Sequence, residues 1–301
     1  MLENVDYLYI DKQMEETLVD PNVPAPAPAP VAAPAPAPVA SNTSDGGGGQ
    51  KTITVAANSG TTTVQNFGGV GIGNSPAPEV AAEIDTLQFQ GDGLTANKML
   101  LTQEGADLVV GFEGVPNTGV RLSNFALANL ENVPTGVGNV LFNGDASSQD
   151  SFDVVNADAN PTRVFNKNTV TFLNDLDNNT QGYEGSNDVI NGQGGNDTLT
   201  GLSGNDILRG GAGNDVLTGG TGADQFWIAS NGLPQGADTI TDFVGGVDVI
   251  GIGGIPGVTG FENLTLTQNG ADTVINAGGQ DLATLTGIQT TTLIATNFAF
   301  G

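Results

Sequence analysis

Five aspartates recur at a strict spacing of nine residues, and this is the clearest chemical pattern in the 301-residue chain. Two residues after each aspartate comes a large apolar side chain, and glycine is frequent in the residues before it. Carboxylates repeated in one register favour a hard divalent cation such as Ca²⁺, which takes about six to eight oxygen ligands. The aspartates are Asp188, Asp197, Asp206, Asp215 and Asp224, and the apolar residues are Ile190, Leu199, Leu208, Leu217 and Phe226.

This spacing requires elements that repeat with the same period. A glycine-rich turn followed by a short strand accounts for one nine-residue unit, and two units complete one coil. Each repeat then stacks on the repeat 18 residues later, with the apolar side chains filling a narrow interior. The aspartates are expected to form two ladders along the outer edges. Because stacked carboxylates about 4.8 Å apart repel one another, a cation between successive turns is expected to relieve the repulsion.

The repeated unit resembles the RTX nonapeptide, G-G-x-G-x-D-x-U-x, whose family folds as a parallel β-roll that binds Ca²⁺. The best copy is GGAGNDVLT at 210–218, whereas the copy at 183–191 lacks the glycine pair. The resemblance implies that the five aspartates are ligands of three or more Ca²⁺ ions, paired as 188 with 206, 206 with 224 and 197 with 215. It also implies backbone carbonyl ligands near Gly195, Gly204, Gly211, Gly213, Gly220 and Gly222.

Acidic residues outside the repeats have secondary places in this hypothesis. Asp238, Asp242 and Asp248 are expected to cap the roll, and Asp242 is chosen as the ligand of a terminal ion. Asp175 and Asp177 precede the roll and lack the glycine and distal glutamate of an EF-hand loop, so they are interpreted as turn residues. Arg209, the residue after the buried Leu208, is expected to be exposed.

Charge and composition exclude several classes of function. The chain holds 33 acidic and 7 basic residues, a formal net charge of −26, and neither histidine nor cysteine. The negative charge repels phosphate backbones, so nucleic acid is excluded as a partner. Without histidine or cysteine there is no thiolate or imidazole metal ligand, no disulfide and no protease or lipase nucleophile–histidine pair. No apolar stretch reaches the about 18 residues of a transmembrane segment.

Composition divides the chain into five zones. Residues 1–20 form an N-terminal arm, and 21–50 form an Ala-Pro and Gly-rich linker. Residues 51–181 are a β-rich domain with short helical patterns at 79–87 and 125–133, residues 182–227 are the roll, and 228–301 are a C-terminal β module. We therefore predict an all-β fold in which a calcium-bound parallel β-roll is flanked by β-rich modules.

The two β modules share one short segment of similar sequence. LTQEGADLVV at 101–110 and LTQNGADTVI at 266–275 are identical at seven of ten positions. This similarity indicates that one β module is duplicated on either side of the repeats.

Two classes of function compete, a structural or adhesive surface protein and an enzyme that carries RTX repeats as a secretion and folding module. The first is a secreted, extracellular calcium-binding structural protein of the cell surface or matrix that self-assembles in calcium as a filament or surface layer. The alternatives are a carbohydrate- or ligand-binding adhesin module, with a cell-surface polysaccharide as partner, or a protein accessory to a secreted hydrolase. Because the catalytic groups above are missing, we expect no enzyme activity.

Two segments bear on export and assembly. The N-terminus has no leader made of a basic region and an apolar region. The RTX resemblance implies type I secretion with a signal at the C-terminus, and the segment QTTTLIATNFAFG at 289–301 is compatible with such a signal. The arm contains β-forming residues between Val5 and Asp11, and a linker of about 3.1 Å per residue lets it reach a neighbouring molecule. We therefore expect self-association through residues 1–20, and the alternatives are a disordered tail or a short amphipathic helix around Lys12 to Val19 that touches the cell envelope.

Overall fold

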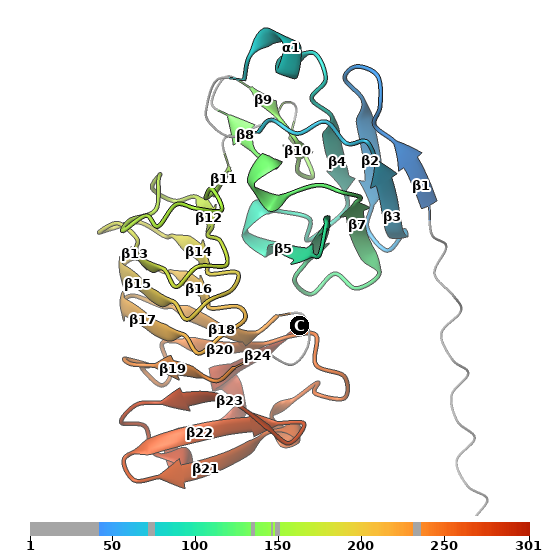
Figure 1. Ribbon diagram of the computed structural model, residues 1–301. Helices are drawn as coiled ribbons and strands as arrows, with labels where there is room; N and C mark the ends of the chain where they lie inside the picture. Colours follow the sequence, from blue (N-terminus) through green and yellow to red (C-terminus); the bar gives the residue numbers. More distant parts are fainter. Residues whose placement is uncertain (1–41, 72–75, 134–135, 146, 148–150, 231–235) are drawn as a thin grey trace, which may run out of the picture. The chain divides into compact units, whose positions relative to one another are not determined.

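Nearly all regular structure in the computed structural model is β-sheet (Figure 1). The only α-helix among the described residues is α1 (Pro78–Ala81). No described helix has the length and apolar content needed to cross a membrane. The N-terminal arm and the Ala-Pro tract, with the docking expected of the arm, lie outside the residues that the structure describes, which are 42–71, 76–133, 136–145, 147, 151–230 and 236–301.

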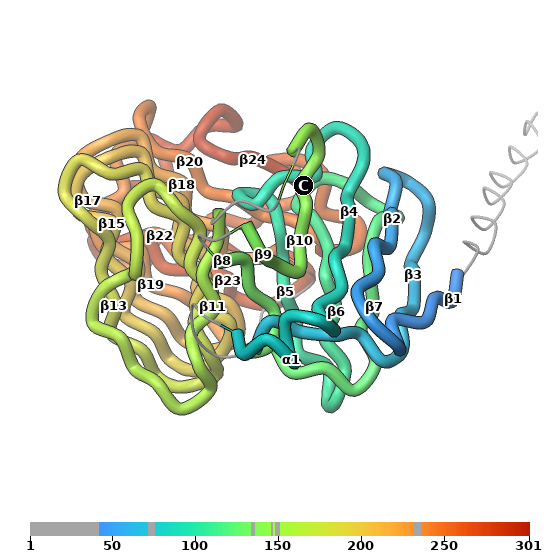
Figure 2. The backbone as a smooth tube through the Cα atoms, turned by 90° about the horizontal axis from the view of Figure 1, so that it is seen from above, coloured from blue at the N-terminus to red at the C-terminus, as the bar shows by residue number. Residues whose placement is uncertain are grey.

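The nonapeptide repeats form two sheets of parallel strands, as the spacing predicts. Strands 18 residues apart pair in register, so that Ile190 lies beside Leu208 and Leu208 beside Phe226. Leu199 lies beside Leu217 in the opposite sheet. Seen from above, the coils lie over one another in successive layers (Figure 2). The five apolar side chains of the repeats are fully buried, at 0% exposure, because each points into the interior between the two sheets.

Each sheet of the roll has seven strands and extends past the predicted bounds of 182 and 227 at both ends. The first sheet contains, in spatial order, β11 (Phe152–Val154), β12 (Val170–Phe172), β14 (Val189–Asn191), β16 (Ile207–Arg209), β18 (Gln225–Ala229), β20 (Val249–Ile252) and β24 (Phe298–Phe300). The second contains β13 (Asn179–Gln181), β15 (Thr198–Ser203), β17 (Val216–Thr221), β19 (Asp238–Ile240), β23 (Gln280–Leu285), β22 (Asp272–Ala277) and β21 (Thr265–Asn269).

The N-terminal module begins earlier than the sequence predicts. Residues 42–45, assigned above to the flexible linker, form a strand that pairs with β3. The larger sheet contains β1 (Asn42–Asp45), β3 (Gly60–Gln65), β7 (Thr118–Leu122), β6 (Asp107–Phe112) and β5 (Met99–Glu104). A second sheet contains β10 (Val140–Leu141), β4 (Thr86–Gln90) and β2 (Thr52–Ala56), and β8 (Asn132–Val133) pairs with β9 (Val137–Gly138).

The two predicted helical patterns form little helix. The first supplies only part of α1, and the second only one 3₁₀ turn at 127–129. Their apolar residues pack into the cores beside the sheets instead, which shows that tertiary packing overrides a short helical pattern. The remaining 3₁₀ turns are Ala96–Lys98, Phe261–Asn263, Thr290–Thr292 and Ala295–Asn297.

Candidate metal centre

The repeat aspartates form two ladders that hold the coils together. Each aspartate ends a turn and precedes a strand, and one of its carboxylate oxygens, Oδ1, accepts a backbone N–H from the coil before it. Asp206 Oδ1 accepts the N–H of Asp188 at 2.7 Å, and Asp224 Oδ1 accepts that of Asp206 at 2.8 Å. On the other ladder, Asp215 Oδ1 accepts the N–H of Asp197 at 2.8 Å. The geometry therefore brings together the three pairs of aspartates that the RTX resemblance implies.

Two of the three aspartates after the repeats continue these ladders. Asp248 Oδ1 accepts the N–H of Asp224 at 3.0 Å, and Asp238 Oδ1 accepts that of Asp215 at 3.2 Å. Asp242 lies elsewhere. Its two oxygens accept the N–H groups of Gly219 and Gly220, at 3.0 and 2.7 Å, so it caps a glycine turn and does not form a rung.

The second carboxylate oxygen, Oδ2, has no hydrogen-bond partner at four of the five repeat aspartates. These buried Oδ2 atoms belong to Asp197, Asp206, Asp215 and Asp224. The five repeat aspartates are at most 1% exposed, whereas the sequence suggested outer edges open to solvent. The glycine turns pack closely against them. A buried carboxylate oxygen without a partner is costly, and coordination of a metal ion is one way to satisfy it.

Two of the unpartnered oxygens lie close to a backbone carbonyl oxygen beside a glycine turn. A Cβ added to Gly192 would fall against both Asp197 Oδ2 and the carbonyl oxygen of Gly210. A Cβ added to Gly201 would fall against Asp206 Oδ2 and lie 2.7 Å from the carbonyl oxygen of Gly219. In both turns a carboxylate oxygen and a carbonyl oxygen therefore lie beside the same glycine, and these are the oxygen types that Ca²⁺ takes as ligands.

The first copy differs from the others. Asp188 Oδ2 accepts the N–H of Tyr183 at 2.7 Å, and its Oδ1 accepts the hydroxyl of Ser186 at 2.5 Å. Ser186 stands where the better copies have glycine, so the departure from the motif supplies a hydrogen bond from the chain itself. Asp188 is therefore satisfied by the protein to a degree that the later aspartates are not.

Burial also changes the pKa values of the ladder aspartates. Desolvation raises the pKa of Asp197 to about 8, and the charges of Asp215 and Asp177 add to the effect. Desolvation likewise raises the pKa of Asp206 to about 6, against the lowering by the hydrogen bond from Asp188. Since calcium binds the ionised carboxylate, a cation in these sites offsets the cost that burial places on the charge.

The six glycines implied as carbonyl ligands all have left-handed backbone angles. Their φ values lie between 97° and 148°, a region that only glycine adopts readily. The carbonyl groups of Gly195 and Gly204 pack against Gly213 and Gly222, in the turns of the next coil on the same side. The six are Gly195, Gly204, Gly211, Gly213, Gly220 and Gly222.

Two features of the site escape the sequence analysis. Carbonyl oxygens beside two of the unpartnered oxygens come from the first glycine of a repeat, Gly210 and Gly219. The residue before each aspartate forms a further ladder, in which Asn187 Oδ1 accepts the N–H of Asn205 at 2.8 Å. Asp177 begins the equivalent ladder on the other side, where its Oδ1 accepts the N–H of Asn196 at 2.7 Å. Asparagine before aspartate in four repeats was the available signal.

The donor set fits calcium. Among the described residues, no three carboxylates gather at one point, so backbone carbonyls must complete any coordination shell in the roll. Two carboxylates with several carbonyls form an all-oxygen shell, which Ca²⁺ accepts in flexible geometry and Mg²⁺ tolerates poorly.

Arg209 is buried, contrary to the exposed position that the repeat pattern predicts. It is 5% exposed, and its guanidinium lies 5.7 Å from the centre of the Trp227 ring. It donates to the carbonyl of Asn97 at 3.1 Å, and its Nε lies 4.0 Å from Glu113 Oε2. The N-terminal module covers this strand, a long-range contact that a local repeat pattern cannot reveal.

Comparison with known proteins finds one family model that matches the repeat region. The family model of the RTX calcium-binding nonapeptide repeat (four copies) matches residues 184–208 and 200–227. A search of curated proteins found no match.

Two solved structures resemble this chain, with low TM-scores. One is the extracellular lipase LipA from Serratia marcescens, at 14% identity and a TM-score of 0.41, covering 84% of this chain and 38% of the lipase. Another is the AlgE6R2 subunit of the Azotobacter vinelandii mannuronan C5-epimerase, at 31% identity and a TM-score of 0.34, covering 44% of this chain and 91% of that subunit. The chain thus spans well under half the length of the lipase.

Proposed function

Because this chain carries the RTX calcium-binding nonapeptide repeat, we propose that it is a secreted, extracellular structural protein whose roll is completed by Ca²⁺. The observation that carries the proposal is the set of four buried Oδ2 atoms without hydrogen-bond partners. Those of Asp197 and Asp206 lie beside glycine turns where a carbonyl oxygen is also close, so that the roll without a cation is electrostatically incomplete.

The chain's own groups have distinct tasks in such a roll. Asp197, Asp206, Asp215 and Asp224 would supply the charged ligands through Oδ2, while their Oδ1 atoms fix the spacing of the coils. First-position glycines such as Gly210 and Gly219 would add carbonyl oxygens. Bound calcium supplies positive charge, which offsets the repulsion between stacked carboxylates.

The calcium requirement links folding to location. Extracellular calcium modules bind at about 10⁻⁴–10⁻³ M, whereas cytosolic calcium is far lower, so the roll would order only after export. We assign export to a type I route, with the C-terminal segment as signal. That segment ends in β24, which pairs with β20, so it also closes one sheet of the roll.

We assign the protein a non-catalytic, assembling role, as a filament or surface layer. Its sequence contains no histidine or cysteine, and its two β modules flank a rigid roll, an arrangement suited to a building block. The arm at residues 1–20 would dock on a neighbouring molecule, and an open sheet edge is the surface that strand addition uses.

The test is folding and assembly of the full chain with and without calcium. A calcium concentration of about 5 mM exceeds the Kd of extracellular modules, which is about 10⁻⁴–10⁻³ M. At that concentration circular dichroism should show more strand than in EGTA, and electron microscopy should show ordered polymers. Magnesium at the same concentration is the control and should restore neither. Equal strand content in EGTA and calcium would refute calcium-coupled folding, whereas a calcium-folded protein that stays monomeric would refute only the assembly.

A further inference from the structure

The modules before and after the repeats have the same strand order. In the C-terminal module, β18, β20 and β24 are parallel neighbours, and β19 pairs with β23 at the edge of the meander β21–β22–β23. In the N-terminal module, β2, β4 and β10 take the same arrangement, and β3 pairs with β7 at the edge of the meander β5–β6–β7. The duplication thus extends well beyond the ten residues that the sequences share visibly.

Side-chain hydrogen bonds confirm the correspondence of the two meanders. Gln103 Oε1 accepts the N–H of Leu127 at 2.8 Å, and Gln268 Oε1 accepts that of Thr290 at 2.8 Å. Both glutamines lie in the first strand of their hairpin, two residues before a glycine with a left-handed backbone. The equivalence thus includes individual hydrogen bonds of the meanders, and the shared strand order carries it on to the turn before β2.

That turn places Lys51 at the position of a ladder aspartate. In the C-terminal module, the N–H of Asp224 donates to Asp248 Oδ1 at 3.0 Å. In the N-terminal module, the N–H of Lys51 donates to Asp85 Oδ1 at 2.8 Å, and Asp85 is fully buried like Asp248. Lys51 is the residue directly before β2, as Asp224 is the residue directly before β18.

The sequence around Lys51 has the form of a nonapeptide. GGGGQKTIT at 46–54 matches GGTGADQFW at 219–227 with glycine at the first, second and fourth positions. Ile53 takes the apolar position of Phe226 and is 8% exposed. Only the aspartate is missing, and a residue of opposite charge replaces it.

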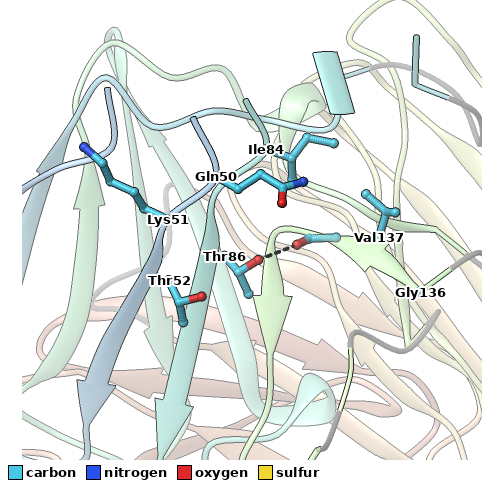
Figure 3. A pocket seen from close by; sticks show the side chains of 8 residues that line it. Gln50, Lys51, Thr52, Ile84, Thr86, Gly136 and Val137 are labelled. Carbon is cyan, nitrogen blue, oxygen red and sulfur yellow. Dashed lines mark hydrogen bonds between the residues drawn. The ribbon is translucent and has the colours of Figure 1, made fainter. Parts of the chain in front are cut away.

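The ammonium group of Lys51 binds the oxygens of this turn. Lys51 Nζ donates to the carbonyl of Asp45 at 3.1 Å and also to the carbonyl of Gly47. Lys51 is half-buried and lines a pocket together with Gln50, Thr86 and Val137, and its side chain extends away from the side chains of Thr86 and Val137 (Figure 3). At Asp224, by contrast, the buried Oδ2 has no partner within the chain.

We infer that residues 46–54 are a nonapeptide in which the Lys51 ammonium takes the place of a calcium ion. The cation that holds the glycine turn is then part of the chain, at a fixed effective concentration. This inference rests on the calcium-dependent roll proposed above and adds a second kind of turn to it. The N-terminal module keeps its first turn and β2 in place without calcium, whereas the turns of the roll require the ion.

Hydrogen–deuterium exchange of the full chain tests this inference. In EGTA, peptides covering 46–56 should exchange slowly in the wild type, while peptides covering 189–229 should exchange slowly only in calcium. Lys51→Met keeps the apolar stem and removes the charge, so exchange at 46–56 in EGTA should rise at least about tenfold. Lys98→Met, at an exposed lysine of the same module, is the matched control and should leave exchange unchanged.

A second variant tests whether calcium can replace the lysine ammonium group in this turn. Lys51→Asp should make protection of 46–56 depend on calcium, with loss in EGTA and recovery in calcium, and Lys51→Arg should behave as the wild type. Equal exchange for Lys51→Met and Lys98→Met, or no calcium response in Lys51→Asp, would overturn the inference. Failure of the wild-type roll to respond to calcium would instead overturn the proposed function, because the comparison in EGTA does not use the roll.

Discussion

At the scale of single residues, the raised pKa values of the ladder link calcium to protons. The pKa of Asp197 is about 8 and that of Asp206 about 6, both above the unfolded value of 3.8. Without calcium, these groups therefore stabilise the fold most fully below pH about 4 and lose that contribution as the pH rises through 6 and then 8. In EGTA, strand content should increase from pH 8 to pH 4, as followed by circular dichroism.

The opposite trend is expected with calcium. The ion binds only the ionised carboxylates, so wherever the calcium-free roll is folded its apparent calcium affinity should fall as the pH drops from 8 to 6, with proton release on binding. Isothermal titration in two buffers of different ionisation enthalpy measures that release. Calcium binding without proton release at pH 7 would show that these carboxylates are already ionised in the calcium-free protein.

Two neighbouring aspartates of one ladder should differ in importance for binding. Asp206 has an unpartnered Oδ2 and belongs to two of the three implied pairs, whereas both oxygens of Asp188 accept hydrogen bonds from the chain. Asp206→Ala should weaken calcium binding at least about tenfold, or about 1.4 kcal/mol, and Asp188→Ala by less. Calcium titrations of the two variants compare them directly. Equal losses would contradict the unequal roles of the two carboxylates.

Arg209 should matter for stability in spite of its place next to the repeat core. Arg209→Ala leaves Glu113 buried without its partner charge, and loss of one member of a buried pair costs about 3–5 kcal/mol. Thermal unfolding in calcium should reveal the loss. Arg121→Ala is the control, because its ion pairs with Glu104 and Asp107 are partly exposed and contribute about 0–1 kcal/mol. Equal melting temperatures for both variants would contradict a structural role for Arg209.

At the scale of elements, the repeats were predictable and their surroundings were not. A period of nine with one apolar residue per unit defines the coil, its buried interior and the stacking of Leu199 on Leu217. Burial of the carboxylates and of Arg209 depends on packing across coils and modules, which no local pattern encodes. The turn at 46–49 was interpreted as a flexible joint because its aspartate position holds Lys51, which hides the repeat.

At the scale of the whole molecule, charge and assembly are linked. A formal charge of −26 keeps copies of the chain apart, and bound calcium lowers that charge by two for each ion. Calcium therefore removes repulsion between molecules as well as between coils. Assembly should then depend on ionic strength as well as on calcium.

Deletion of residues 1–20 tests the arm. The truncated chain should bind calcium as the full chain does, because the described sheets of the roll begin at Phe152 and Asn179, but it should form no polymers. Light scattering and electron microscopy in calcium compare the two proteins. A variant that replaces the arm with a Gly-Ser segment of equal length controls for chain length, and polymers from either altered protein would show that another surface drives assembly.

The last rungs of both ladders have a kinetic consequence. Asp238 and Asp248 lie in the C-terminal module, whose strands are also held by an antiparallel meander. In a solenoid, each coil is stabilised only by its nearest neighbours, so an isolated coil within an unordered array has nothing to build on. The coil that contains Trp227 adjoins this module, and ordering that starts at this end should propagate toward Phe152. The coils would then order one after another from this end, so the fluorescence of Trp227 should change before the coils nearer Phe152 become protected from hydrogen exchange.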